Sequence, residues 1–354
     1  MDNTAETRDT SGTLDEALER LHTSGPERDD WLSNHAPMAV EALTRHGHAG
    51  DVHRWLDRYR HKLEAMPRPT AAVRKDNWQQ ALGDPSRIAD WTAHFEREIT
   101  ERPWRDVLTE WWPRLLPSIT AAATHPVIRV GHAVRTLLAD GPATTAPREA
   151  ELAHALGYWA ARHQPLPEVS RPPLPAEEGS PAEALAAVEP VPDQQGGIRG
   201  RLAQLTALPA WPAGAAGPEA VPALLSELVR ASTHRYATHG HGDPVMLVHA
   251  ATAPNAVLRT LPALPHELWP ASLHAAWSAS AAVTAAYAPR EPADFAAASA
   301  LHPGEVFEKV AAHGDEHAIK FADTALDVVD GALPGDGRAL AAAVRACELI
   351  EPAH

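Results

Sequence analysis

Apolar residues recur at spacings of three and four along nearly the whole chain, and this pattern limits the possible folds more than any other feature. Residues 51–66, for example, place Val52, Trp55, Leu56 and Tyr59 on one side of a helix. Alternating strand patterns bounded by Asn-Gly or Asp-Gly turns are missing from the sequence. We therefore predict an all-α fold. The segments with helical spacing are 13–23, 36–47, 51–66, 87–100, 104–123, 127–140, 149–163, 220–237, 244–261, 269–288, 302–329 and 337–350.

The predicted helices are best grouped into one large domain. Residues 1–25 are assigned to a polar N-terminal segment, and residues 26–354 to a single helical domain. A stretch rich in Pro, Glu and Gly, about residues 165–197, is predicted to cross the surface, with one short helix at SPAEALAAV. The helical segments on its two sides look alike, which favours one helical body with a long connection over two domains.

Composition excludes several classes of function. The net charge of −15 argues against nucleic acid as a partner, since phosphate binding needs clustered Lys and Arg. The single cysteine, Cys347, rules out a disulfide framework and a thiolate metal site. No Gly-rich loop of a Rossmann or phosphate-binding kind is visible. The sequence has neither a secretory signal nor a membrane-length apolar run, so we expect a soluble cytoplasmic protein.

The chain contains 21 histidines, and imidazole is both a common metal ligand and a common general base. His35 and His125 each lie at a predicted helix start, close to a proline. His249, in PVMLVHAATAPNAVL, has apolar neighbours on every side, so its ring needs a buried hydrogen-bond partner. His132 returns to the face of His125 after two turns, about 11 Å away, and the two can hardly bind one metal. For each of these histidines, the alternative to metal binding is a structural role in which the imidazole is hydrogen-bonded to the backbone.

A lysine shares a helical face with a histidine in HGDEHAIKFADTAL, residues 313–326, where His317 and Lys320 are one turn apart. In one interpretation the Lys320 stem lies along the apolar face and its ammonium reaches solvent. In the other, burial lowers the pKa of the amine and makes it neutral. A neutral amine acts as a base, forms a Schiff base, or takes up carbon dioxide as a carbamate. Spacing alone does not choose among these.

Five blocks of the sequence, in this order, resemble those of the questin oxidase-like family. The resemblance runs from about residue 30 to about residue 330. It implies an all-α oxygenase that acts on polyketide anthraquinones, either by a Baeyer–Villiger-type ring opening or by carbon–carbon cleavage at a non-haem iron held by four histidines and a carboxylated lysine. The blocks are NHAPMAVEAL, THPVIRVGHAVRTL, ELAHALGYWAARHQ, LVHAATAPNAVLRTLP and DEHAIKFADTALD.

The resemblance also implies a set of metal ligands. Carried onto this chain, the ligands are His35, His125, His249, His317 and Lys320. His132 is the substitute if one assignment fails, since fungal relatives tend to have a second histidine where this chain has Arg129. Arg129 is expected near the iron, where it would pair with a phenolate or carboxylate of the substrate. Nitrogen ligands with one anionic oxygen suit Fe(II) and leave a position for dioxygen.

Two other functions stay open from the sequence. One is a monooxygenase without tightly bound metal that takes electrons from NADPH, directly or through a separate reductase. The other is a non-catalytic helical protein that binds a polyketide, in which the histidines are structural and Lys320 is an ordinary amine. Flat walls for a polycyclic ligand would come from aromatic residues, with ordinary core packing as the alternative for each. These residues are Trp111, Trp112, Tyr158 and Trp159.

Overall fold

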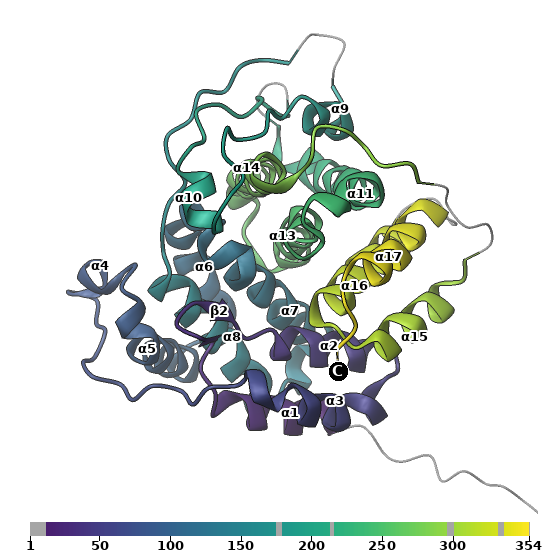
Figure 1. The fold of residues 1–354 in the computed structure, drawn as a ribbon. Helices are drawn as coiled ribbons and strands as arrows, with labels where there is room; N and C mark the ends of the chain where they lie inside the picture. The colour runs from purple at the N-terminus through teal and green to yellow at the C-terminus, as the bar shows by residue number, and fades with distance from the viewer. Residues whose placement is uncertain (1–11, 175–178, 213–215, 296–300, 332–335, 354) are drawn as a thin grey trace, which may run out of the picture.

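The structure is a computed structural model that describes residues 12–174, 179–212, 216–295, 301–331 and 336–353, and it is built almost entirely of helices (Figure 1). The predicted all-α class is confirmed. Within these ranges the only strands are β1 (Glu27–Arg28) and β2 (Leu32–Ser33), which form a small antiparallel hairpin. No helix in the same ranges has the length and apolar content needed to span a bilayer.

The helices follow the predicted segments. The N-terminal half has α1 (Thr13–His22), α2 (Ala36–Arg45), α3 (Val52–Tyr59), α4 (Trp78–Ala81), α5 (Ile88–Glu101), α6 (Trp104–Leu115), α7 (His125–Asp140) and α8 (Ala146–Ala161). The C-terminal half has α9 (Pro181–Ala186), α10 (Ile198–Leu202), α11 (Val221–His239), α12 (Pro244–Leu247), α13 (His249–Thr260), α14 (Trp269–Tyr287), α15 (Pro303–His313), α16 (Glu316–Gly331) and α17 (Gly337–Leu349). Predicted segment 302–329 forms two helices because Gly314 has a left-handed φ of +80°. Helices α4 and α10, of four and five residues, are too short to be found from apolar spacing.

Part of the polar N-terminal segment packs into the helical body. Helix α1 buries Leu14, Leu18 and Leu21, at the spacing the sequence indicates, and contacts α2, α3 and α8. Residues 1–11 of that segment lie outside the described residues. In the connection at 165–197 the predicted short helix is α9, and Ser180 caps it in a reciprocal capping box with Glu183. Residues 175–178 of the connection also lie outside the described ranges.

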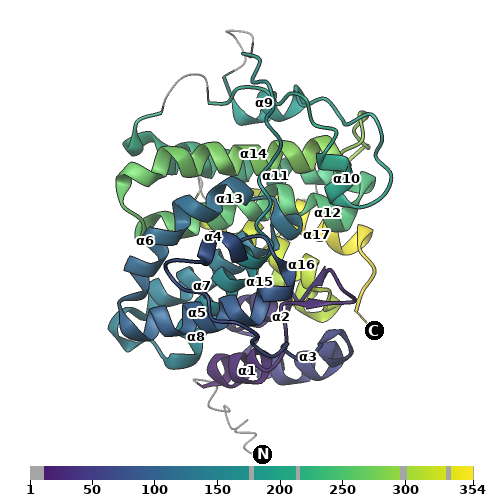
Figure 2. The same ribbon diagram turned by 90° about the vertical axis from the view of Figure 1, so that its left-hand side faces the viewer.

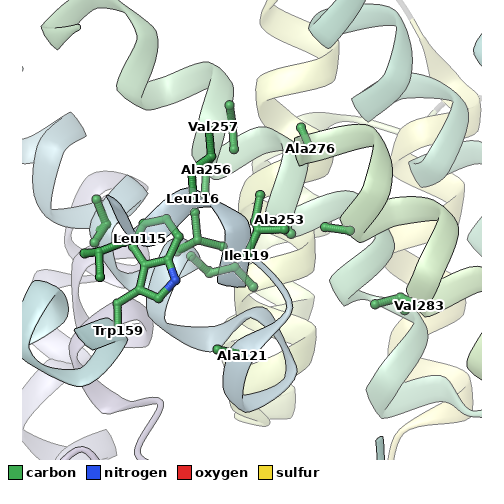
Figure 3. Close-up of a cluster of buried hydrophobic side chains, with 14 of the residues drawn as sticks. Leu115, Leu116, Ile119, Ala121, Trp159, Ala253, Ala256, Val257, Ala276 and Val283 are labelled. Carbon is green, nitrogen blue, oxygen red and sulfur yellow. The ribbon is translucent and has the colours of Figure 1, made fainter. Parts of the chain in front are cut away.

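Helix α13 occupies the middle of the molecule, where it contacts α7, α11, α14 and α16 (Figure 1). In Figure 2, α14 lies toward one end of the molecule, and α1 and α3 lie at the other. Figure 3 shows part of the apolar core around α13, where Ala253 and Ala256 lie near Ile119 and Trp159. Because α13 begins at His249, the core packing of this helix places that imidazole deep inside the protein.

Close packing of α7 on α13 depends on Gly131. A Cβ atom added at Gly131 would lie 2.5 Å from both Cα and Cβ of Ala256, so only glycine permits this separation of the two helices. Since α7 begins at His125 and α13 at His249, the packing of these two helices also affects the distance between the two imidazoles.

We expect Gly131→Ala to lower the free energy of unfolding by about 1–3 kcal/mol, because the added methyl forces α7 and α13 apart. Urea unfolding followed by circular dichroism measures the loss. Gly200→Ala is the matched control, because a Cβ there meets no atom within 4 Å and alanine favours the helix α10 that contains it. Equal stability of Gly131→Ala and wild type would show that the two helices separate at little cost.

Candidate metal centre

Four histidines and one lysine from four helices meet in the interior. His35 immediately precedes α2, His125 begins α7 and His249 begins α13, while His317 and Lys320 lie in the first turns of α16. All five are buried, with exposed fractions of 9% or less. The structure therefore brings together the five residues that the family resemblance implies as ligands.

His125 faces both His35 and His249 through Nε2 atoms. Nε2 of His125 lies 2.7 Å from Nε2 of His35 and 3.0 Å from Nε2 of His249. The ring of His317 is 4.4 Å from that of His35 between centroids, and 5.8 Å from that of His249. One ring nitrogen each from His35, His125 and His317 lie within 4.8 Å of one another. Such a group of nitrogens is close enough to share one ion.

The turn before α7 determines the orientation of His125. Three consecutive residues that are not glycine, Ala122, Ala123 and Thr124, have left-handed φ values of 43°, 56° and 68°. Each such residue costs about 1–3 kcal/mol, and strain of this kind concentrates at functional sites. The turn brings the carbonyl of Ala122 to 2.6 Å from Nδ1 of His125. The strained turn and this hydrogen bond thus hold the imidazole with its Nε2 toward the other rings.

Hydrogen bonds to the backbone fix the tautomers of two rings. Nδ1 of His125 donates to Ala122, and Nδ1 of His249 donates to the carbonyl of Met246 at 3.0 Å. In neutral rings the proton is then on Nδ1, so the two Nε2 atoms, 3.0 Å apart, both carry lone pairs. Burial lowers the pKa of His35, His125 and His249 well below the ordinary value, and the charge of Lys320 lowers it further. Protonation is therefore a poor way to relieve the repulsion between the lone pairs.

A metal ion fits this arrangement. Two nitrogens bound to one ion at about 2.1 Å and at a right angle lie about 3.0 Å apart, close to the Nε2 separations seen here. Imidazoles that bind metals usually donate their other N–H to a carbonyl or carboxylate, as His125 and His249 do. A cation between the rings would convert lone-pair repulsion into coordination.

Lys320 does not extend to solvent. Its side chain is fully buried, and no acceptor in the described part of the chain lies within hydrogen-bonding distance of its Nζ. Burial lowers the pKa of Lys320 from 10.5 to about 7, although the carboxylates of Glu316 and Asp315 oppose this shift. Of the two interpretations open from the sequence, the structure supports the desolvated amine.

The ends of four helices contribute electrostatically to the centre. The N-termini of α2, α7, α13 and α16 all converge on it, and helix N-termini carry partial positive charge. Two carboxylates provide negative charge beside them. Asp315 accepts N–H groups of His317 and Ala318, and interaction with His317 outweighs burial and lowers the pKa of Asp315 to about 2. Glu316 lies 2.9 Å from Nζ of Lys62 and 3.9 Å from Nδ1 of His35. The centre therefore combines four helix N-termini with two carboxylates around the five side chains.

His132 belongs to a second buried group. Its Nδ1 lies 2.6 Å from Glu41, and its Nε2 lies 4.0 Å from Asp323. These three residues also have the donor types and spacing of a metal site. However, Arg135 pairs with both Glu41 and Asp323, so arginine already neutralises the two carboxylates.

Arg129 is held by a carboxylate of the protein. Its guanidinium donates two hydrogen bonds to Glu151, at 2.6 and 2.8 Å, and both side chains are buried. His22 lies 3.0 Å from the same carboxylate. The sequence predicts a substrate anion as the partner of Arg129, whereas in the structure Glu151 occupies that role.

The Arg129–Glu151 pair predicts an acid-sensitive contribution to stability. Arg129 outweighs burial and lowers the pKa of Glu151 from 4.5 to about 2, so the folded state binds this proton less readily than the unfolded state. The stabilisation is complete above pH 4.5 and is lost as pH falls toward 2, a difference of about 3 kcal/mol. We expect the free energy of unfolding, measured in urea, to depend less on pH in Glu151→Gln than in wild type across this window. Glu348→Gln, at a half-exposed carboxylate, should keep the wild-type slope, and equal slopes for all three proteins would contradict the prediction.

Sequence reasoning missed the groups that orient the ligands. The carbonyls of Ala122 and Met246 have no side-chain signal in the sequence, because their role depends on the backbone of a strained turn and of a helix start. Asp315 had a signal, since an aspartate just before a helix is a common cap. Glu316 had none beyond its proximity to His317.

Comparison with known proteins adds one match. A family model described as Questin oxidase-like matches residues 32–325, a range that includes every residue of the centre. No curated protein matches the chain.

Proposed function

The chain belongs to the questin oxidase-like family, and from this membership we propose that it is an iron-dependent oxygenase of aromatic polyketides. The family implies an oxidoreductase, an oxygenase that acts on anthraquinone-type substrates. Our more specific proposal is that the chain uses dioxygen to open a quinone ring or to cleave a carbon–carbon bond of such a substrate. The iron would be held by His35, His125, His249, His317 and a carboxylated Lys320.

One observation carries the proposal of a metal. The Nε2 atoms of His125 and His249 lie 3.0 Å apart, and neither bears a proton in the neutral rings. Fe(II) bound there would supply the redox chemistry that lets dioxygen react with an aromatic ring. Four neutral imidazoles and one anionic oxygen donor suit this ion and leave room for a further ligand.

Lys320 would supply the anionic donor. Its lowered pKa, about 7, leaves about half of the buried amine neutral at pH 7. The nitrogen lone pair forms a bond to the carbon of carbon dioxide, a carbon–oxygen π bond becomes an oxygen lone pair, and one proton leaves the nitrogen. The product is a carbamate with two carboxylate-like oxygens. The four converging helix N-termini stabilise this anion in the buried site.

Elemental mass spectrometry of protein purified without chelators or a histidine tag tests the proposal. We expect near one iron per chain, together with oxygen uptake when a hydroxyanthraquinone is added. Metal-free protein that turns over only with NADPH would replace the proposal with a monooxygenase. Metal-free protein that binds a quinone without consuming oxygen would replace it with a binding protein.

A further inference from the structure

A cleft of about 610 Å³ lies beside the turn that positions His125. Its walls come from the β1–β2 hairpin, the turn at Thr120–Ala122, the segment 162–167 after α8, and α10 with the residue after it. The hairpin and α10 lie on the same side of the molecule (Figure 1). We call it the Trp31 cleft, after the exposed aromatic residue in its wall.

Two walls of the Trp31 cleft belong to chain segments that continue into residues of the metal centre. Ala122 lines the cleft, and its carbonyl accepts the Nδ1–H of His125. Trp31 lies four residues before His35, at the turn of the hairpin that leads into α2. Ala121 lines the cleft as well, beside the apolar core (Figure 3). A ligand in the cleft therefore lies against the segments that hold two of the four imidazoles.

The Trp31 cleft offers a flat apolar surface. Trp31 is 60% exposed, and with Leu32 it accounts for the exposed large hydrophobic residues of the described ranges. Its indole faces α10, since a Cβ added at Gly197 would lie 3.8 Å from the ring. The aromatic residues named from the sequence as ligand walls, by contrast, are all buried, with exposed fractions of 2% or less. An exposed indole in a cleft is a surface on which a planar ring system can stack.

The charged groups of the Trp31 cleft are two arginines and one glutamate. Arg162 and Arg199 line it, together with one carboxylate, Glu27, which accepts a 2.5 Å hydrogen bond from Arg162. Arg199 is exposed in the described structure. Because Glu27 balances Arg162, the cleft has the charge of Arg199 in excess, in contrast with a chain whose net charge is −15, and it suits a ligand that carries negative charge.

We propose that the Trp31 cleft binds a planar polycyclic aromatic substrate that carries a phenolate or carboxylate, with Trp31 stacking on the rings and Arg199 pairing with the anion. This inference rests on the proposed function, because it assigns a place to the substrate of the metal centre. The bound rings would lie against the Ala121–Ala122 turn, next to the imidazole of His125. Arg199 would then select for the acidic group and determine which end of the molecule enters first.

Isothermal titration calorimetry of the full chain with two probes tests the proposal. The probes are anthraquinone-2-carboxylate and the neutral 2-(hydroxymethyl)anthraquinone, which differ in charge but have the same ring system. Trp31→Ala should weaken binding of both probes about tenfold, while Trp31→Phe, which keeps an aromatic face, should stay close to wild type. Arg199→Gln should weaken binding of the carboxylate about tenfold and leave the neutral probe unchanged.

Arg290→Gln is the control for loss of one surface arginine, because Arg290 is exposed, pairs with Glu189 and does not line the cleft. Unchanged affinity of Trp31→Ala and Arg199→Gln for both probes would overturn the proposal. Iron content, measured on the same samples, separates this outcome from failure of the proposed function. If wild type contains no metal but its binding of the probes depends on Trp31 and Arg199, the cleft proposal is kept and the iron oxygenase is rejected. If the protein contains iron and is active but the cleft variants bind both probes like wild type, the iron oxygenase is kept and the cleft is rejected.

Discussion

Lys320→Ala is expected to lose nearly all bound iron and to lower turnover of an anthraquinone more than about 100-fold. Even partners that only orient a metal ligand typically contribute 10–100-fold to affinity or activity, and this substitution removes the sole anionic donor proposed for the ion. Elemental mass spectrometry gives the iron content per chain, and oxygen uptake gives the rate. Lys309→Ala, at an exposed lysine on α15, should keep both at the wild-type level.

Chemical rescue distinguishes a carboxylated lysine from a lysine that acts as a base. Lys320→Ala removes several buried methylene groups and leaves a space in their place. The proposed carbamate oxygens would lie at the inner end of this space. Acetate or propionate can enter this space and present carboxylate oxygens to the metal, whereas ethylamine, in buffer freed of carbon dioxide, presents only a nitrogen. We expect the carboxylates to restore iron binding and part of the turnover. Restoration by ethylamine alone would show that the free amine, and not a carbamate, is the working group.

Local structure around the ligands was largely predictable from the sequence. His35 was predicted at a helix start, and it is the residue immediately before α2. His317 and Lys320 were predicted on one helical face, and both lie on α16. These predictions succeed because a helix start and a shared helical face depend on neighbours within a few residues.

Contacts between distant segments were not predictable in the same way. Spacing places Arg129 one turn after His125 on α7, which makes a shared site plausible. The long side chain of Arg129 instead places its guanidinium against Glu151, a buried carboxylate on α8. Two turns along α7, His132 likewise meets Glu41 from α2. Which carboxylate a buried cation reaches depends on how whole helices pack, and the periodicity of one helix contains no such information.

Helix packing also explains why four imidazoles converge. Asp323, on α16 one turn after Lys320, accepts hydrogen bonds from three arginines, and each arginine comes from another helix of the metal centre. The donors are Arg45 on α2 at 2.8 Å, Arg135 on α7 at 3.0 Å and Arg259 on α13 at 2.6 Å. The helices that carry His35, His125 and His249 are therefore joined to α16 through Asp323, and Asp327 on the same helix also pairs with the three arginines.

Asp323→Asn is expected to lower the free energy of unfolding by about 3–5 kcal/mol, because it removes one charge from a buried, mutually neutralised group. Asp323 is fully buried, and Arg135 and Arg259 outweigh that burial and hold its pKa well below the usual range. An asparagine keeps the size of the side chain but leaves the positive charge of the arginines in excess. Urea unfolding of the metal-free protein measures the loss without a contribution from bound iron.

Asp57→Asn is the matched control, since Asp57 also pairs with an arginine, Arg20, but at side chains that are 68% and 44% exposed. That pair should contribute no more than about 1 kcal/mol. A loss of similar size in both variants would show that water solvates the arginines when Asp323 is neutral. If the larger loss is found, Asp323→Asn should also bind iron more weakly than wild type under conditions where it remains folded. The spacing of the imidazoles depends on helices that this carboxylate helps to hold together. Stability and metal affinity should therefore fall together, although Asp323 is not itself a proposed ligand.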